Sequence, residues 1–409
     1  MASAHQRSDH PLGARHAKSL RRHELRRQLL TATLAIAVFL VSCLAFAYSN
    51  LQGNVNRHDV DDLLGTDRPT RMDDDGEQEG PEDARAGSAL NILVLGSDSR
   101  QGANDDGSDV GGMRSDTTMI AHVSADRSRL EVVSIPRDTL VDIPECHLPN
   151  GTQTAAEYDA MFNRAFALGG QTGDVAYAAA CTIQTVEELT GVPIDDFVVV
   201  DFAGFQAVIE ALDGVPMYIP EPVDDPSAHV SLEAGCHVLN GQDALGYARA
   251  RYGVANSDGS DINRIGRQQQ LVAAIAREAL SIQLLTNPPA LYRFLNAGTK
   301  TLTTGEWVGR LPNMAGLANS LRGIEPENIR FATMPFEWAG ARVVPAADAD
   351  TVWDNLLHDR PIDADITATG DEPTIDEPSS EEPTTDAATT EEPTSVRPSQ
   401  EETTPACTR

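Results

Sequence analysis

The chain has 409 residues, of which 41% are hydrophobic, and a formal net charge of −31. This length allows one large domain or two ordinary ones. An acidic balance of this size argues against a nucleic-acid partner, because binding to duplex DNA usually needs a basic surface.

The first predicted element is a membrane span. Residues 1–28 hold seven Lys and Arg against two acids, and residues 29–48 follow without a charge. An apolar helix of about 20 residues matches the hydrocarbon thickness of a bilayer, and the basic flank predicts a cytoplasmic N-terminus. An uncleaved signal-anchor is the preferred interpretation. Two alternatives remain open: residues 45–47 (AFA) resemble a signal-peptidase site, and residues 40–43 (LVSC) resemble a lipobox with Cys43 lipidated. All three interpretations export the rest of the chain.

Two acidic segments flank the predicted folded domain. Residues 51–88 carry eleven acids but few large apolar residues, which is typical of a solvated spacer. The tail repeats EEPTT-like units, and Pro, Thr and Glu without aromatic residues cannot bury enough surface to fold. The predicted organisation is a cytoplasmic basic tail (1–28), a transmembrane signal-anchor (29–48), an acidic linker (49–88), an extracytoplasmic catalytic domain (89–360) and a disordered acidic Thr/Pro-rich tail (361–409).

Four cysteines lie outside the predicted membrane span, where disulfides persist: Cys146, Cys181, Cys236 and Cys407. Four cysteines allow three pairings. A Cys146–Cys181 disulfide is preferred, because it would staple the loop 144–157 to the following helix; buried thiols are the alternative. The pairing of Cys236 and Cys407 stays open.

Residues 89–360 alternate strand-like and helix-like patterns, which predicts an α/β fold. Residues 89–96 form an apolar run that ends in glycine, as a buried strand does. Residues 117–124 and 130–135 are joined by a short polar turn, which predicts a β-hairpin. Further strands are expected at 197–200, 215–219, 329–333 and 342–344, and helices at 154–168, 174–190, 202–212, 241–246, 262–283, 287–296, 306–321 and 347–358.

A set of arginines stands out against this acidic background. Arg249 and Arg251 are spaced i, i+2, which in an extended segment places both guanidinium groups on one face. Arg264, Arg267 and Gln268 share one face of the next predicted helix. Guanidinium groups that converge repel one another unless an anion lies among them, and their planar fork matches phosphate geometry, so a pyrophosphate site is predicted. The arginines of this set are Arg114, Arg137, Arg249, Arg251, Arg264 and Arg267.

Two aspartates complete the predicted site. Asp98 follows the first predicted strand, where α/β sheets present functional groups, and Asp116 precedes the next strand. Mg²⁺ is commonly held by one or two carboxylates together with substrate phosphate oxygens. We therefore expect the two aspartates to hold Mg²⁺ (or Mn²⁺), or one of them to take a proton from an acceptor hydroxyl as general base.

Each of these residues also has a structural interpretation. Arg114 and Asp116 could form a surface ion pair, and Arg137 could cap a strand end. Arg249 and Arg251 could be solvated charges on an edge strand. The functional interpretation therefore depends on the residues meeting in space.

Taken together, the segments resemble the LytR-CpsA-Psr family of cell-wall ligases. The matching stretches include NILVLGSDSR (91–100), VVSIPRDTLVDIP (132–144), LEAGCHVLNGQDALGYARARYG (232–253) and DINRIGRQQQLV (261–272). They extend over about 90–272 in the family order. The resemblance implies a single α-β-α sandwich domain with a mixed central sheet, preceded by one transmembrane helix.

The resemblance also implies a function. It is the transfer of a glycopolymer from a polyprenyl-pyrophosphate carrier to peptidoglycan or a surface protein, with release of polyprenyl phosphate. The protein would be a single-pass membrane protein whose catalytic domain faces the cell wall. The implied site has Asp98, Asp116, Arg137, Arg249 and Arg251 as catalytic residues, both aspartates as metal ligands, and Arg114, Arg264, Arg267 and Gln268 as further pyrophosphate ligands beside the arginines already named.

Two other functions remain open at this point. One is a pyrophosphatase that hydrolyses the polyprenyl pyrophosphate with water as the acceptor. The other is a non-enzymatic lipid-binding or attenuator protein.

Overall fold

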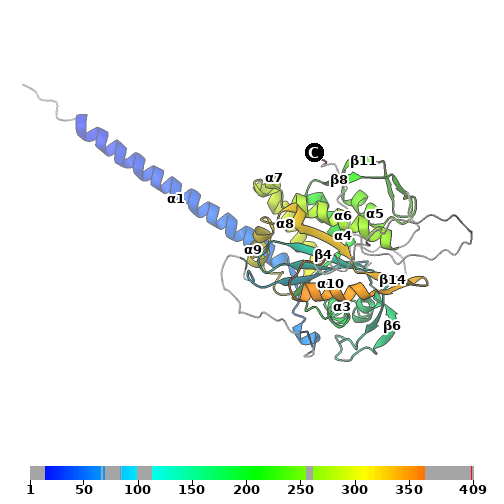
Figure 1. The fold of residues 1–409 in the computed structure, drawn as a ribbon. Helices are drawn as coiled ribbons and strands as arrows, with labels where there is room; N and C mark the ends of the chain where they lie inside the picture. The colour runs from blue at the N-terminus through cyan, green and yellow to red at the C-terminus, as the bar shows by residue number, and fades with distance from the viewer. Residues whose placement is uncertain are drawn as a thin grey trace, which may run out of the picture. The chain divides into compact units, whose positions relative to one another are not determined.

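The computed structural model describes residues 14–65, 68–69, 83, 85–98, 113–254, 261–363 and 407, and the chain divides into two compact units between Gly53 and Asn54. Helix α1 (Ala14–Asn54) makes up the first unit (Figure 1). Its part from Arg26 to Asn54 is long and apolar enough to cross a membrane, with a mean hydropathy of 2.5. This helix contains the predicted span at 29–48.

The second unit is built on a mixed sheet. Among the described residues this sheet has seven strands in the order β1-β12-β7-β2-β3-β4-β13. Strand β3 is antiparallel to β2 and β4, whereas β7 is parallel to β2 and β13 is parallel to β4. The strands are β1 (Asn56–Arg57), β2 (Leu90–Ser97), β3 (Ser115–Val123), β4 (Leu130–Ile135), β7 (Asp196–Asp201), β12 (Leu302–Thr304) and β13 (Ile329–Thr333).

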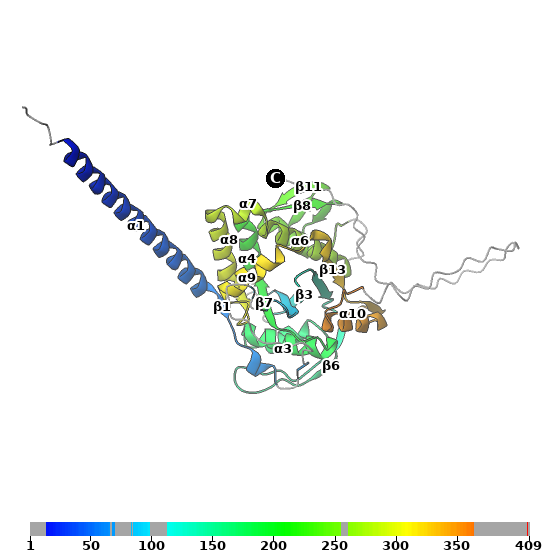
Figure 2. The same cartoon turned by 60° about the vertical axis from the view of Figure 1, so that its left-hand side comes forward.

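Helices cover this sheet, with α3 below the strands and α6 and α8 above them in Figure 2. The described helices of this unit are α2 (Arg164–Gly169), α3 (Val175–Thr190), α4 (Phe202–Ala211), α5 (Gly241–Arg249), α6 (Asp261–Ala279), α7 (Ile282–Leu285), α8 (Pro288–Thr301), α9 (Leu311–Leu321) and α10 (Ala347–Leu357), with 3-10 turns η1 (Asp61–Leu63) and η3 (Pro326–Asn328). Local sequence sets several of their ends. The side chains of Asp174, Asp201 and Asn240 accept backbone N–H groups at the starts of α3, α4 and α5, and Gly191 ends α3 at φ 66°.

Strand β2 shows why both faces of the sheet are covered. Alternate residues of a strand point to opposite faces. Leu93 and Leu95 accordingly pack into a large cluster with residues of α3 and α10, whereas Leu90 and Ile92 pack into a smaller one with α9. The sheet therefore has helices on both sides, and the expected α-β-α sandwich with a mixed sheet is confirmed.

Four two-stranded sheets surround this core. They are β5 (Leu140–Ile143) with β6 (Glu157–Met161), β8 (Val215–Ile219) with β11 (Gly235–Leu239), β9 (Val223–Asp225) with β10 (Val230–Leu232), and β14 (Phe336–Ala339) with β15 (Arg342–Pro345), counted over the described residues. Alternate residues of β8 are buried, and they join side chains of α4, α5, α6 and α8 in a third hydrophobic cluster.

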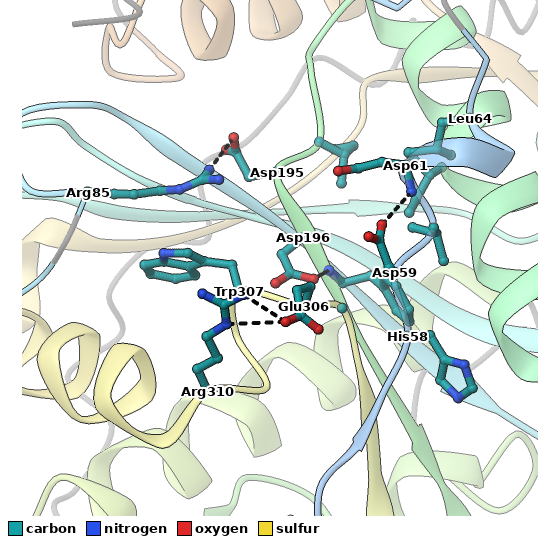
Figure 3. A pocket seen from close by; sticks show the side chains of 15 residues that line it. His58, Asp59, Asp61, Leu64, Arg85, Asp195, Asp196, Glu306, Trp307 and Arg310 are labelled. Carbon is teal, nitrogen blue, oxygen red and sulfur yellow. Dashed lines mark hydrogen bonds and ion pairs between the residues drawn. The ribbon is translucent and has the colours of Figure 1, made fainter. Parts of the chain in front are cut away.

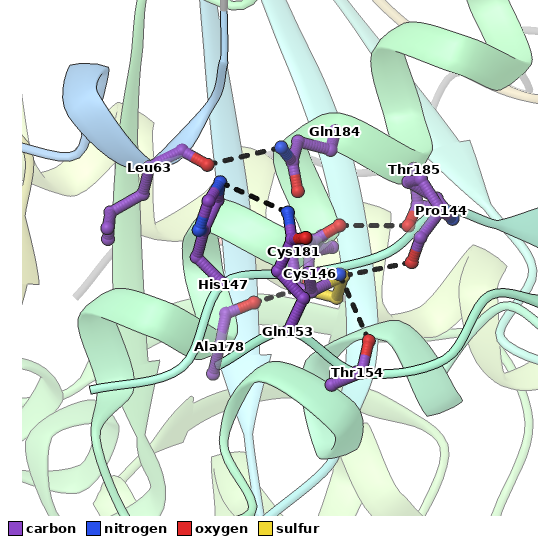
Figure 4. Close-up of a disulfide and its surroundings, with 11 residues drawn as sticks. Leu63, Pro144, Cys146, His147, Gln153, Thr154, Ala178, Cys181, Gln184 and Thr185 are labelled. Carbon is purple, nitrogen blue, oxygen red and sulfur yellow. Dashed lines mark hydrogen bonds between the residues drawn. A yellow bond between two sulfur atoms is a disulfide. The ribbon is translucent and has the colours of Figure 1, made fainter. Parts of the chain in front are cut away.

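Two disulfides cross-link the second unit. Cys146 and Cys181 form the disulfide that the sequence favoured, with their Cα atoms 5.2 Å apart, and it joins the loop after β5 to α3 (Figure 4). Cys236 on β11 is bonded to Cys407, which is 171 residues further along the chain. The rest of the predicted disordered tail, residues 364–406 and 408–409, lies outside the described residues.

Part of the predicted acidic linker belongs to the folded unit. Within 49–88, β1 pairs in parallel with β12, and Val60 and Leu64 are 7% and 6% exposed in the large core cluster. Arg68 makes two hydrogen bonds to the carboxylate of Glu187 on α3, at 2.7 and 3.0 Å. The expectation of a solvated spacer is wrong for this stretch, because its few apolar residues find a place in the core.

Two predicted helices also begin later than expected. The first half of 154–168 forms strand β6, because it pairs with β5, and helix α2 follows only from Arg164. The helix expected at 306–321 begins at Leu311, since the preceding residues form a turn whose Val308 N–H donates to the Asp196 carboxylate.

Candidate active site

The predicted site residues lie along one edge of the central sheet. Asp98 follows the end of β2, Asp116 is the second residue of β3, and Arg137 comes two residues after β4. Because β3 is antiparallel to both neighbours, its start meets the ends of β2 and β4. Strand β7 runs parallel to β2, so its last residue, Asp201, lies at the same edge. We call this edge of the sheet, which holds Asp98, Asp116, Arg137 and Asp201, the arginine edge.

Asp116 is the centre of the arginine edge. Its Oδ1 lies 2.7 Å from Nη1 of Arg137, and its backbone carbonyl accepts a hydrogen bond of 3.0 Å from Nη2 of Arg264. Burial alone would raise the pKa of Asp116, but the charges of Arg137, Arg264 and Arg251 outweigh burial and hold that pKa below its usual range. Three arginines that are distant in sequence therefore act on one carboxylate.

Helix α5 carries the Arg-Ala-Arg motif to this edge. Arg249 is the last residue of α5, and its guanidinium carbon lies 4.7 Å from the ring centroid of Phe202, which begins α4. Arg251 lies beyond the helix. The extended segment expected for these two arginines is therefore wrong, because α5 continues from its cap at Asn240 through Arg249.

Asp225 fixes the turn after α5, and the sequence analysis missed it. Its Oδ2 accepts the backbone N–H groups of Arg251 and Tyr252 at 2.8 and 3.0 Å. Burial raises the pKa of Asp225, but hydrogen bonds from Ser227 and from backbone N–H groups outweigh burial and lower it. The sequence Asp-Pro-Ser at 225–227 is typical of an Asx turn and could have indicated this role.

Helix α6 contributes residues of two kinds. Arg264 is 3% exposed and reaches Asp116, as described above. Arg267 and Gln268 instead contact the backbone at the end of α5: Arg267 donates to the carbonyl of Ala250, and Gln268 donates to that of Ala248 at 3.3 Å. These two side chains hold the turn that carries Arg251.

Gln269, which the sequence analysis did not select, fixes α6 against the sheet. Its Nε2 donates to Oγ of Ser134 and to the carbonyl of Ala332, both at 2.9 Å. Ser134 belongs to β4 and Ala332 to β13, so Gln269 ties the helix to the two strands nearest Arg137. The position of Arg264 follows from this anchor.

Asp98 and Arg114 are paired through the backbone. The N–H of Asp98 donates to the carbonyl of Arg114 at 2.9 Å, and the N–H of Arg114 donates to Oδ1 of Asp98 at 2.6 Å. Within the described residues, no group of three or more His, Cys, Asp or Glu is placed to hold a metal ion. Asp98 follows β2 and Asp116 lies on the adjacent strand β3, so these two carboxylates would need further ligands, such as phosphate oxygens, to hold Mg²⁺ or Mn²⁺.

A polar pocket at the opposite end of the sheet is separate from the arginine edge (Figure 3). It has a volume of about 190 Å³ and contains Asp196, the first residue of β7. Its arginines are paired within the pocket: Arg85 lies 2.7 Å from Asp195, and Arg310 lies 2.7 Å from Glu306. Charges that neutralise one another in this way offer less to an anionic ligand than the arginine edge does.

The fold and the site together describe an α/β protein with an apolar N-terminal helix and a cluster of arginines at one edge of its sheet. Three of these arginines act on the carboxylate of Asp116. Guanidinium groups that converge in this way suit phosphate ligands.

The family model described as the LytR_cpsA_psr family matches residues 48–356, and the chain belongs to this LytR-CpsA-Psr family. It is 33% identical over 243 residues to "Probable cell wall biosynthesis protein LcpB" of Corynebacterium glutamicum, covering 58% of this chain and 53% of that protein. It is 30% identical over 270 residues to "Cell wall biosynthesis protein LcpA" of the same organism, covering 61% and 50%. The chain thus spans about half the length of these curated relatives.

Solved structures show the same fold. The "LytR-Csp2A-Psr enzyme from Actinomyces oris" superimposes with a TM-score of 0.51 at 21% identity, over 74% of this chain and 96% of that one. Bacillus subtilis TagV superimposes with a TM-score of 0.50 at 22% identity, over 68% and 96%.

Proposed function

We propose that this protein transfers a glycopolymer from a polyprenyl-pyrophosphate carrier to a cell-wall acceptor and releases polyprenyl phosphate. The observation that carries the proposal is the convergence of Arg137, Arg251 and Arg264 on Asp116. Family membership and relatives named for cell wall biosynthesis support the same reaction. The helix from Arg26 to Asn54 supports a membrane anchor, which would keep the domain close to a lipid-linked donor.

The reaction exchanges one oxygen on phosphorus for another. The acceptor hydroxyl oxygen forms a bond to the phosphorus that carries the glycan, and the bond from that phosphorus to the bridging oxygen breaks. The bridging oxygen leaves with the bonding electrons as polyprenyl phosphate. The hydroxyl proton passes to a carboxylate of the site.

The arginines supply binding and charge stabilisation. Arg137, Arg251 and Arg264 would hold the pyrophosphate, and Arg249 would flank it from the end of α5. Because phosphoryl transfer is catalysed mainly by positioning and electrostatics, preorganised guanidinium groups are the main contribution of the protein. Their fixed positions come from Asp225 and Gln269, which hold the turn after α5 and helix α6.

The two aspartates would divide the remaining work. The pKa of Asp116 is held low by the arginines, so this carboxylate stays ionised and is a weak proton acceptor. Asp116 therefore suits a metal ligand, and Asp98 would share the metal or take the proton of the acceptor hydroxyl. A bound Mg²⁺ or Mn²⁺ would neutralise charge on the phosphate oxygens.

The test uses the full-length protein, a polyprenyl-pyrophosphate-linked oligosaccharide, Mg²⁺, and peptidoglycan present or absent. We expect polyprenyl phosphate and glycosylated peptidoglycan as products. Arg251→Ala should lower the transfer rate by at least about a hundredfold, because it removes a preorganised charge from the transferring phosphate. The matched control is Arg310→Ala, whose arginine pairs with Glu306 at the opposite end of the sheet and should leave transfer unchanged.

Other outcomes would reject the proposal. Retained transfer in both Arg249→Ala and Arg251→Ala would remove the proposed site. Release of polyprenyl phosphate at the same rate without peptidoglycan, and no glycosylated product with it, would identify a pyrophosphatase. Binding of the donor without any product would identify a lipid-binding protein.

A further inference from the structure

The hairpin β14–β15 adjoins the arginine edge. It follows β13 in the chain, and its second strand forms a parallel bridge from Val343 to Thr139, two residues after Arg137. Asp138 contacts both the hairpin and Arg137: its Oδ1 lies 3.2 Å from Nη1 of Arg342 on β15 and 3.8 Å from Nε of Arg137. The hairpin is therefore anchored to the segment that supplies Arg137.

Trp338 is the exposed aromatic residue of this hairpin. It is one of three tryptophans in the chain, and it lies on β14 with 55% of its surface exposed. Half-buried Phe336, two residues earlier on the same face, meets it edge to face, with ring centroids 5.7 Å apart. The pairing of Trp338 with buried Val343 fixes its backbone, and the contact with Phe336 packs one side of the indole while more than half of the residue stays open to solvent.

The distance between Trp338 and the arginine edge suits an extended ligand. Trp338 pairs with Val343, and Val343 bridges to Thr139. Because neighbouring strands lie about 4.8 Å apart, the Trp338 backbone lies roughly 10 Å from that of Thr139. A ligand that reaches from a phosphate at Arg137 to β14 therefore crosses about two strand spacings.

We propose that Trp338 is a stacking platform for a sugar ring of the acceptor, so that the acceptor is a glycan strand. The proposal rests on the transfer reaction above and names its acceptor class. A pyranose ring has an apolar face of C–H groups, and the electron-rich face of an indole attracts such polarised hydrogens. An exposed tryptophan on a hairpin that is anchored to the segment of Arg137 suits this ligand. A protein acceptor, which presents its hydroxyl on a single side chain, needs no such platform.

The first experiment separates binding of the acceptor from binding of the donor. The full-length protein is assayed with the lipid-linked oligosaccharide and a soluble uncrosslinked peptidoglycan tetrasaccharide. We expect Trp338→Ala to raise KM for the tetrasaccharide about tenfold, with kcat and KM for the donor unchanged, and Trp338→Phe to recover most of the loss. The matched control is Tyr158→Ala, which removes another exposed aromatic residue, on β6, and should leave both KM values unchanged.

The second experiment reads binding without turnover. Trp307 is partly buried and Trp353 is 3% exposed, so Trp338 should dominate any change in tryptophan fluorescence caused by the tetrasaccharide. We expect this change in wild type and its loss in Trp338→Phe, although that variant still transfers. A folded Trp338→Ala variant with an unchanged acceptor KM would overturn the platform, as would an equal effect of Tyr158→Ala. A wild-type protein that transfers only to a surface protein would overturn the glycan acceptor while leaving the transfer reaction intact. Failure of wild type to transfer to any acceptor would instead reject the proposed function.

Discussion

Two arginines with largely buried side chains lie near opposite ends of the β3–β4 hairpin and differ in their surroundings. Arg127 is in the turn between the strands; its Nε donates to Asp83 at 2.6 Å, and its other nitrogens donate to backbone carbonyls, including those of Arg85 and Ser88. Arg264 approaches the other end, at Asp116, together with Arg137 and Arg251. One arginine is matched by its own buried carboxylate, whereas the other shares a carboxylate with further arginines.

This difference separates a structural cation from one that belongs to the proposed site. Burial raises the pKa of Asp83, but the hydrogen bond and charge of Arg127 outweigh burial and lower it, so the pair stabilises the fold. At the arginine edge, three arginines act on the one carboxylate of Asp116, while Gln269 and Asp225 hold the elements that carry Arg264 and Arg251. A bound anion would reduce the repulsion among these three guanidinium groups.

The comparison predicts opposite effects on transfer and on stability when methionine replaces Arg264 or Arg127. Arg264→Met should lower the transfer rate by about 10²–10³, because a preorganised charge is lost. Its unfolding free energy should stay within about 1 kcal/mol of wild type or rise, since repulsion with Arg137 and Arg251 is relieved. Arg127→Met should lower that free energy by about 3–5 kcal/mol, because Asp83 is left buried and unpaired. The folded fraction of this variant should transfer normally.

Denaturant unfolding of the full-length proteins in detergent, together with the transfer assay, measures both quantities. The backbone of Arg127 is left-handed, at φ 58°, but methionine is strained there to the same extent as arginine, so the substitution does not change this cost. A loss of several kcal/mol of unfolding free energy in Arg264→Met would show that Arg264 is needed for folding. The predicted difference between the two arginines would then be wrong.

Much of the fold could be predicted from the sequence, because local signals there agree with the tertiary structure. The apolar run at 89–96 became β2, and the helix at 174–190 became α3, which begins at its Asp174 cap and ends at Gly191. Strands β1, β6 and β12 were not expected. They are short or polar, and they exist because partner strands offer them hydrogen bonds; the pairs β1–β12 and β12–β7 join strands that are distant in sequence.

The site could be predicted by residue type but not by arrangement. Asp116, Arg137, Arg251 and Arg264 meet as expected. The role of Asp225 was missed, because its partners are backbone N–H groups at 251 and 252, which no side-chain pattern reveals. The orientation of Arg249 was also missed: a spacing of i, i+2 indicates a shared face only in a strand, and here a helix ends between the two arginines.

A smaller effect is expected at Asp196, in the pocket opposite the arginine edge. Burial raises the pKa of Asp196 to about 6, and backbone N–H groups of Val308 and Phe197 oppose that rise only in part. The folded state therefore binds a proton that the unfolded state, with a pKa of about 3.9, releases. Asp196 thus stabilises the fold most below about pH 4, and this contribution is lost as the pH rises through about 6.

Asp196→Asn isolates this contribution, because asparagine does not titrate. As the pH falls from about 6.5 to about 4, the unfolding free energy of wild type should gain about 2 kcal/mol relative to the variant. Unfolding curves of both proteins across this pH range give the difference, in which the other titrating groups cancel. Parallel pH profiles would show that Asp196 has an ordinary pKa and that this end of the sheet is more solvated than its burial indicates.

The smallest effect is expected for Arg310→Ala in the same pocket. Arg310 and Glu306 are an i, i+4 pair with 55% and 45% of their side chains exposed, and such pairs contribute less than about 0.5 kcal/mol. Glu306 also keeps Arg57 at 4.0 Å, and the hydrogen bond from the Met314 N–H to the Arg310 carbonyl survives the substitution. The unfolding free energy should therefore change by less than about 0.5 kcal/mol, and less again in high salt. A cost above about 1.5 kcal/mol would mean that even exposed arginines at this end are needed for folding. In that case, pairing with a buried acid would no longer distinguish structural arginines from those of the arginine edge.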